Sequence, residues 1–286
     1  FQLPVTSRPF RFTGKLYMRF GSDWFVCTAS LVEKGVLITA AHCVAGYGAG
    51  AAGIADEVIW YPGNYNSAGG FWGYFTAQSI HVPAPYLNGT DTCDFFANGV
   101  VCNNDIATVV LAIRNGLLAG QAMGGWYAYA WNGYSYQASA AFGGHTVADI
   151  TQLGYPAAID AGYQMLRVNS FGKYVTSTVT TNGEMLLNTQ LGSAMSGGSS
   201  GGPWMVNFGT RPIVTDTTLA FLGYQNATNN VVGVTSWGYT DRLVNVQGAS
   251  WFGQNFEYPA ADYGGRGAGN IGALMDTTCT TTPSHC

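Results

Sequence analysis

Apolar and β-branched residues gather in short runs along the whole chain, and Gly, Asn and Ser separate the runs. The pattern predicts strands over residues 11–20, 24–32, 35–39, 58–61, 75–82 and 105–113. A second series is predicted over residues 126–131, 134–141, 165–168, 174–181, 185–189, 204–208, 221–224 and 231–236. Helical periodicity is scarce, and only residues 40–44 favour a single helical turn. Many short strands with turns between them are typical of β-barrels and sandwiches.

Two further stretches complete this picture. Residues 115–125 are expected to link two β units, and the Gly- and Thr-rich residues from 264 onward are expected to form a tail.

A glycine-rich turn, Gly198-Ser199-Ser200-Gly201-Gly202-Pro203, presents one serine ahead of an apolar run. Serine holds its proton at neutral pH, so a nucleophilic serine needs a base and a third group that orients the base. It also needs donors for the oxyanion that forms, and glycines let a substrate carbonyl approach backbone N–H groups. Such a turn is also typical of an ordinary flexible loop. The interpretation therefore depends on a base and an acid elsewhere in the chain.

His42 and Asp105 are the candidates for these two groups. His42 follows the apolar residues 36–41 and precedes Cys43, while Asp105 opens an apolar run that continues to Ile113. The alternatives are a structural histidine and an aspartate that caps a turn. Because His42 would need an acceptor to orient it, we favour a partly buried acceptor role for Asp105.

Four segments in the order His, Asp, Ser resemble the chymotrypsin-like serine peptidases, the double-barrel group that includes trypsin and the bacterial glutamyl endopeptidases. They are Thr39-Ala40-Ala41-His42-Cys43, Asp105-Ile106-Ala107, Gly198-Ser199-Ser200-Gly201-Gly202-Pro203 and Ser236-Trp237-Gly238. Gly154-Tyr155-Pro156 is similar to a segment of the glutamyl endopeptidase branch. The resemblance implies an all-β fold of two six-stranded antiparallel barrels with the active site in the cleft between them. Residues 1–120 would carry His42 and Asp105, and residues 121–286 would carry Ser200 and the substrate pocket.

The same resemblance implies a role for each residue. Ser200 would attack a peptide carbonyl, His42 would move the proton, and Asp105 would accept the imidazole Nδ1–H. The N–H groups of Gly198 and Ser200 would bind the oxyanion. The segment Ser236-Trp237-Gly238 would pair with the substrate backbone, with Ser236 also contacting Asp105; an ordinary strand with a buried Trp237 is the alternative. No metal or organic cofactor is expected.

The chain departs from the trypsin pattern at two places. Ser199 stands where trypsin-like members have an aspartate that pairs with a freed N-terminal amine, and Phe1 does not begin the usual Ile-Val-Gly-Gly. We therefore expect that an N-terminal ammonium does not build the oxyanion hole.

Motif spacing predicts that Ala194, Met195 and Thr235 line the primary specificity pocket. Ala194 provides no acid for Arg or Lys, and Thr235 replaces the histidine of the glutamyl endopeptidases. These differences favour an apolar or broad preference for the P1 residue, the residue before the scissile bond. Asp241 could lie near the rim of this pocket, but we favour a solvated loop acid.

Composition indicates which partners and which cellular location to expect. Charged residues make up 9% of the 286 residues and the net charge is -4, which suggests no nucleic-acid partner. No apolar run reaches the ~18 residues that span a bilayer.

The six cysteines lie close together in pairs, which predicts the bridges Cys27–Cys43, Cys93–Cys102 and Cys279–Cys286. Together with acceptor sequons for glycans at Asn88 and Asn226, the bridges favour a secreted, extracellular protein. The spacing does not fit a zinc site.

The sequence thus predicts a secreted, monomeric serine endopeptidase that acts on proteins or peptides. Three alternatives remain: a non-catalytic homologue that binds peptides or glycans, a glutamate-specific endopeptidase, and an esterase. The turn does match the esterase elbow as Gly198-x-Ser200-x-Gly202. That elbow, however, accompanies the order Ser, Asp, His and alternating strands and helices.

Overall fold

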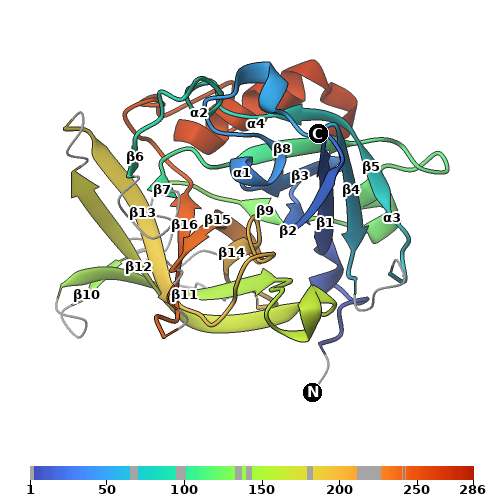
Figure 1. Cartoon of the computed structure of the whole chain (residues 1–286), viewed down its shortest axis with the longest axis horizontal. Coiled ribbons are helices and arrows are strands. Elements are labelled where there is room, and N and C mark those ends of the chain that lie inside the picture. The colour runs from blue at the N-terminus through green and yellow to red at the C-terminus, as the bar shows by residue number, and fades with distance from the viewer. Residues whose placement is uncertain are drawn as a thin grey trace.

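Short strands close into two β-barrels that lie side by side (Figure 1). The computed structural model describes residues 3–64, 70–94, 101–132, 137–139, 144–178, 183–210, 227–239, 241 and 243–286. The predicted strand at residues 221–224 lies outside this part of the chain.

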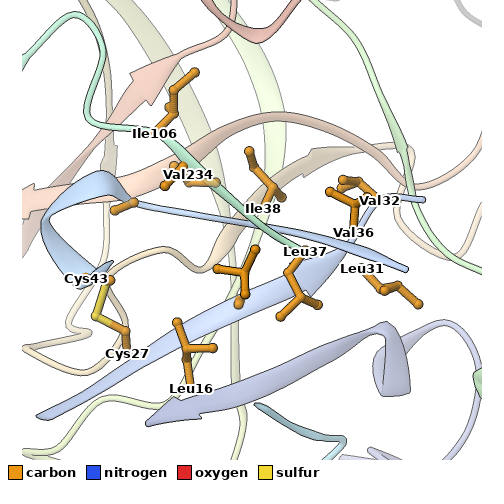
Figure 2. Packing of buried hydrophobic residues seen from close by; sticks show 14 of the residues in the cluster. Leu16, Cys27, Leu31, Val32, Val36, Leu37, Ile38, Cys43, Ile106 and Val234 are labelled. Atoms are coloured by element: carbon orange, nitrogen blue, oxygen red, sulfur yellow. A yellow bond between two sulfur atoms is a disulfide. The ribbon is translucent and has the colours of Figure 1, made fainter. Parts of the chain in front are cut away.

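The first barrel contains six antiparallel strands. In barrel order they are β1 (Thr13–Phe20), β2 (Asp23–Leu31), β3 (Val36–Thr39), β8 (Ala107–Leu111), β5 (Phe75–His81) and β4 (Glu57–Pro62). Every residue of β3 and β8 is buried, which explains their unbroken apolar runs. Figure 2 shows Leu16, Leu37 and Ile38 packed in this interior, and the same cluster extends to Val234 of the second barrel.

The second barrel also contains six antiparallel strands. They are β11 (His145–Gly154), β12 (Leu166–Thr178), β13 (Met185–Gly192), β16 (Val246–Trp251), β15 (Asn230–Gly238) and β14 (Pro203–Val206). Pairing of β11 with β14 closes the ring. Two short strands extend it, β10 (Gln137–Ser139) beside β11 and β9 (Ala128–Tyr129) parallel to β15. The predicted all-β fold of two six-stranded barrels is confirmed.

The remaining elements lie in the connections. The helices are α1 (Ala41–Val44), α2 (Ala84–Asn88), α3 (Ala119–Met123) and α4 (Gly269–Thr281), and a small hairpin joins β6 (Cys93–Asp94) to β7 (Val101–Cys102). Single 3-10 turns occupy Phe10–Phe12, Gly50–Gly53, Asp160–Gly162 and Pro283–His285. All three predicted disulfides are present. No helix of the described residues is long and apolar enough to cross a membrane.

The structure corrects the sequence prediction in several places, and helices α2 and α3 are among the elements that were not expected. β11 and β16 were not expected, because buried polar residues such as Gln152 and Gln247 interrupt their apolar patterns. Residues 166–178 form one strand instead of two. The expected tail contains α4, whose Gly and Thr residues have low helix propensity. The helix is stabilised by packing on β5 and β8, where the Thr108 and Thr278 hydroxyls lie 2.6 Å apart.

The division at residues 120 and 121 stays a prediction. α4 belongs in sequence to the second half, yet it packs on the first barrel.

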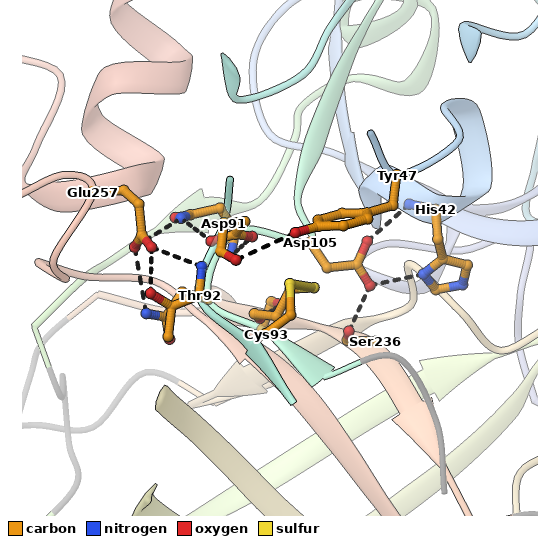
Figure 3. The surroundings of a disulfide bond; sticks show 12 residues. His42, Tyr47, Asp91, Thr92, Cys93, Asp105, Ser236 and Glu257 are labelled. Carbon is orange, nitrogen blue, oxygen red and sulfur yellow. Dashed lines mark hydrogen bonds and ion pairs between the residues drawn. A yellow bond between two sulfur atoms is a disulfide. The ribbon is translucent and has the colours of Figure 1, made fainter. Parts of the chain in front are cut away.

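A carboxylate pair, the buried Asp91 and the half-buried Glu257, connects the loop before β8 to the segment after β16 (Figure 3). Asp91 accepts hydrogen bonds from the backbone N–H and the Nδ2 of Asn104, the neighbour of Asp105, at 2.9 and 2.7 Å. Glu257 accepts from Thr92 N–H at 2.7 Å and from Asn104 Nδ2 at 3.3 Å. Burial, followed by the nearby Glu257 carboxylate, raises the pKa of Asp91 to about 8. The Asn104–Asp105 backbone is therefore held by a carboxyl group that favours its protonated form.

We predict that replacing Ile38 by Ala lowers the free energy of unfolding by about 2–5 kcal/mol, because Ile38 is 0% exposed and its loss leaves a cavity. The matched substitution Ile113→Ala, at a side chain that is 58% exposed, should change it by only about 0.5 kcal/mol. Urea unfolding followed by fluorescence measures both. Equal losses would contradict the assignment of β3 to the barrel interior.

We also predict that stability falls as pH rises from about 4 to about 8. The folded-state pKa of Asp91 lies above its ordinary value of 3.8, so stability is fully present at low pH and is lost as the group ionises in the folded state. Asp91→Asn should flatten this dependence, while Asn in place of the exposed Asp23 should preserve it. Urea unfolding at several pH values tests the slope, and an unchanged slope in Asp91→Asn would refute the prediction.

Candidate active site

His42 and Asp105 meet at one end of the first barrel. β3 ends at Thr39 and the single turn of α1 places His42 just beyond it. Asp105 lies two residues before β8, and Thr39 pairs with Ala107 at the start of that strand. Because β3 and β8 are antiparallel, the end of one lies beside the beginning of the other. Two residues that are 63 positions apart in sequence therefore become neighbours.

The Asp105 carboxylate accepts three hydrogen bonds (Figure 3). The backbone N–H of His42 lies 2.8 Å from Oδ1, and the imidazole Nδ1 lies 2.7 Å from Oδ2. The Ser236 hydroxyl, from β15 of the second barrel, donates to Oδ2 at 2.5 Å. Asp105 is 0% exposed, whereas 30% of the His42 side chain remains exposed. The contact of Ser236 with Asp105 that the resemblance implies is present.

These contacts determine the proton arrangement of His42. A carboxylate only accepts hydrogen bonds, so Nδ1 carries the proton and Nε2 of the neutral ring is an acceptor. Burial of the ring lowers the pKa of His42, but the charge and hydrogen bond of Asp105 raise it, and the pKa lies above its ordinary value of 6.5. A neutral His42 can therefore accept a proton at Nε2 and the carboxylate stabilises the cation that results.

Ser200 lies in the loop between β13 and β14. Its carbonyl accepts a hydrogen bond from the Thr28 N–H of β2 at 2.8 Å, which ties the loop to the first barrel. Gly198 and Gly201 have φ of +94° and +75°, in the left-handed region that favours glycine. A Cβ on Gly201 would also overlap the Thr39 hydroxyl. Glycine is therefore required on both sides of Ser200 for steric reasons.

His42 and Ser200 line one cavity of about 590 Å³. The six residues predicted from the motifs to bind substrate all line it as well: Ala194, Met195, Thr235, Ser236, Trp237 and Gly238. Asp241, interpreted from the sequence as a solvated acid, is exposed but also lines this cavity. The structure thus brings together His42 and residues from within 194–200 and 235–241, three separate parts of the chain.

A second hollow, of about 510 Å³, also borders His42 and Ser200. It is mainly apolar, with Met18, Phe20 and Phe25 in its wall and the Cys27–Cys43 bridge beside them. The pair formed by His42 and Ser200 therefore lies between two hollows.

The end of β15 presents an open strand edge beside the first cavity. β14 pairs with β15 as far as Val234, whereas β16 continues to pair as far as Gly238. In the described part of the chain, Ser236–Gly238 therefore has a strand neighbour on one side only. The Trp237 side chain is buried, as in the alternative of an ordinary strand. This burial is compatible with the open backbone edge, because the side chain and the backbone edge are different parts of the strand.

Residues 193–202, between β13 and β14, form the loop that carries Ser200 and are called the serine loop. Sequence reasoning missed the buried polar residues that contact this loop. Gln152 and Gln247 are buried and hydrogen-bonded to each other, and Gln247 contacts Ser199. A signal for them exists, because each is a polar residue in an otherwise strand-like segment.

The two glycan acceptor sequons differ in position. Asn88 is exposed at the end of α2, and Asn226 lies outside the described residues. Two clusters have several potential ligand atoms, Cys27 with His42 and Cys43, and Asp91 with Cys93 and Cys102. The sulfurs of both clusters are in disulfides and so are not the thiolates that bind zinc.

Comparison with solved structures finds proteins of similar fold. A crystal structure of a thermostable serine protease, AL20, from an extremophilic microorganism is 23% identical with a TM-score of 0.60, covering 85% of this chain and 92% of that one. The protease Anisep from Arthrobacter nicotinovorans is 21% identical with a TM-score of 0.62, covering 86% and 92%. A Glu endopeptidase is 15% identical with a TM-score of 0.54, covering 99% and 96%.

Searches at the level of sequence give a different result, since no family model and no curated protein matches the chain. The likeness therefore lies in the three-dimensional arrangement of the barrels: the chain has the fold of the chymotrypsin-like serine proteases.

Proposed function

We propose that the chain is a serine endopeptidase that hydrolyses peptide bonds with Ser200 as nucleophile, His42 as base and acid, and Asp105 as the orienting acceptor. The observation that carries the proposal is the buried Asp105 carboxylate, which holds His42 Nδ1 at 2.7 Å while the ring borders the cavity that Ser200 also lines. The protease descriptions of the structural neighbours agree with it.

The reaction follows from these positions. Ser200 Oγ forms a bond to the substrate carbonyl carbon while its proton moves to His42 Nε2, and the carbonyl oxygen becomes an oxyanion. The N–H groups of Gly198 and Ser200 bind that oxyanion. The C–N bond then breaks, and the leaving amine takes the proton from His42. Water then attacks the acyl carbon while His42 accepts its proton, the bond from that carbon to Ser200 Oγ breaks as Oγ takes the proton back from His42, and the acid product leaves.

The two hollows and the open strand edge suit a polypeptide substrate. The backbone before the scissile bond would add to Ser236–Gly238 as an extra strand, and the P1 side chain would enter the cavity beside Ala194, Met195 and Thr235. These three residues carry no charge, and the Asp241 carboxylate that borders the same cavity is exposed to solvent, which favours an apolar or broad P1 preference. The apolar hollow beside Phe25 would receive the residues after the scissile bond.

The cellular setting belongs to the same proposal. Three disulfides favour an oxidising, extracellular location, and the exposed Asn88 is open to glycosylation. We propose a secreted monomer that acts on protein or peptide substrates, with no membrane or nucleic-acid partner.

Cleavage of a denatured protein mixture, with Ser200→Ala as control, tests the proposal. The wild type should cleave after apolar or varied residues and react with a fluorophosphonate at Ser200. Ser200→Ala should lose both reactions, with kcat lower by about 10⁶-fold. Ala in place of the exposed Ser22 should behave as wild type. A wild type that neither cleaves nor labels would support a non-catalytic binding protein instead, and a strict preference for Arg, Lys or Glu would contradict the pocket assignment.

The pH profile of kcat/KM tests the role of His42. The base must be neutral, and Asp105 raises its pKa against the effect of burial, so activity should fall with an acid-side midpoint above 6.5. In Asp105→Asn the His42 ring stays buried, which lowers its pKa, but the carboxylate charge that raises this pKa is gone. The midpoint should therefore move below that of the wild type, and kcat should fall about 10⁴-fold. A midpoint that does not move in Asp105→Asn would refute this role, and NMR titration of the wild-type imidazole provides a second measurement.

A further inference from the structure

Hydrogen bonds fix the directions of the carbonyl groups in the serine loop. The Gly197 carbonyl accepts from Ala157 N–H at 2.7 Å, and the Gly198 carbonyl accepts from the Thr28 hydroxyl at 2.8 Å. In a trans peptide the C=O and the following N–H point in opposite directions. The Gly198 N–H, which shares a peptide unit with the Gly197 carbonyl, is therefore directed away from Ala157.

The next two peptide units are held in the same way. The Ser199 carbonyl accepts from Gly202 N–H at 2.9 Å, so the Ser200 N–H is directed away from Gly202. The Ser200 carbonyl accepts from the backbone N–H of Thr28 at 2.8 Å. Among the described residues, neither the Gly198 nor the Ser200 N–H donates to a backbone carbonyl, whereas Ser199 N–H donates to Ser196. Two N–H groups thus remain for a ligand.

Thr28 makes this arrangement depend on the first barrel. Its hydroxyl accepts from Tyr155 N–H at 3.1 Å and donates to the Gly198 carbonyl, and the side chain is fully buried in β2. One hydroxyl therefore connects a strand of the first barrel, the segment after β11 and the serine loop.

Ser199 anchors the loop from the second barrel. Its buried hydroxyl donates to the Ser196 carbonyl at 2.6 Å and accepts from Gln247 Nε2 at 3.1 Å. Gln247 Nε2 also donates to the Met195 carbonyl at 2.8 Å. Both amide hydrogens of Gln247 are thus used to hold the loop.

Gln152 completes the network. Its Nε2 donates to Gln247 Oε1 at 2.5 Å and to the Thr235 hydroxyl at 2.9 Å, and its Oε1 accepts from the Ser193 hydroxyl at 2.7 Å. All donors and acceptors of the two glutamine amides are satisfied in consistent directions. Every member of the network is uncharged, so no ionisable partner is required to keep it buried.

We propose that Thr28, Ser199, Gln152 and Gln247 are positioning residues that hold the serine loop in its oxyanion-binding conformation through uncharged hydrogen bonds alone. The inference rests on the proposed function, because it assigns these residues to the oxyanion site of the same reaction. A buried aspartate at position 199 would need a cationic partner. Ser199 needs none, so the loop keeps its conformation without an ammonium group from a chain terminus.

Thr28→Val and Ser199→Ala test the proposal with a peptidyl aldehyde and the matched peptidyl alcohol. The aldehyde carbon bonds to Ser200 Oγ and its oxygen occupies the oxyanion site, whereas the alcohol binds without forming an oxyanion. Since one lost oxyanion donor costs about 10²–10³ in kcat, a loosened loop should weaken aldehyde binding by about 10–100-fold. Binding of the alcohol, and KM, should change less than about threefold, because neither side chain lines the cavity.

Ser30→Ala is the matched control, since Ser30 is a buried hydroxyl whose side chain bonds to Thr13 in the first barrel. It should reduce stability without selective loss of the aldehyde. Parallel weakening of both ligands in the test variants, or no weakening, would overturn the inference. If the wild type binds aldehyde no better than alcohol, the proposed function fails instead. If Thr28→Val does not fold, Ser199→Ala decides, because alanine retains the Cβ and adds no atoms.

Gln152→Glu tests whether the network must be uncharged. An ionised carboxylate cannot donate to Gln247 Oε1, so kcat should fall as pH rises through the ionisation of the new group, with KM unchanged. The wild type should show no such step, and a variant that retains the wild-type profile and kcat would refute the requirement.

Discussion

The buried carboxylate of Asp105 is the constraint on which the site depends. Burying a charged group is costly unless its acceptors are satisfied, and here three donors satisfy them. Two donors come from His42 at the end of β3, and the third is Ser236 of β15. One side chain therefore fixes the imidazole, determines which of its nitrogens is protonated and connects the two barrels. The apolar packing of β3 against β8 brings Asp105 to this position.

The proposed reaction places a complementary requirement on the serine loop, because two backbone N–H groups must stay unpaired to bind the oxyanion. The loop achieves this by engaging its carbonyls instead, through Thr28 and the segment after β11. Glycines at 198 and 201 allow the backbone angles, and the buried glutamines fill the space beneath. The first barrel thus contributes to the geometry of a loop that belongs in sequence to the second.

The sequence predicted what depends on local pattern. Strands β3 and β8 of the first barrel follow unbroken apolar runs, and the disulfides follow short cysteine spacings. The roles proposed for His42, Asp105 and Ser200 came from a resemblance in four short segments, since no spacing rule joins residues so far apart. β11 and β16 were missed because Gln152 and Gln247 look unfavourable in a barrel until their mutual hydrogen bonds are known. α4 was missed because tertiary packing outweighs the low helix propensity of its Gly and Thr residues.

A crystal structure of the protein reacted with a peptidyl boronic acid would test the central geometry most directly. The account predicts a tetrahedral boron bonded to Ser200 Oγ, with one boronate oxygen accepting from the N–H groups of Gly198 and Ser200. His42 Nδ1 should remain on Asp105, and the Gly197 carbonyl should remain on Ala157. A boronate bonded elsewhere, or bonded to Ser200 with its oxygens turned away from both N–H groups, would contradict it.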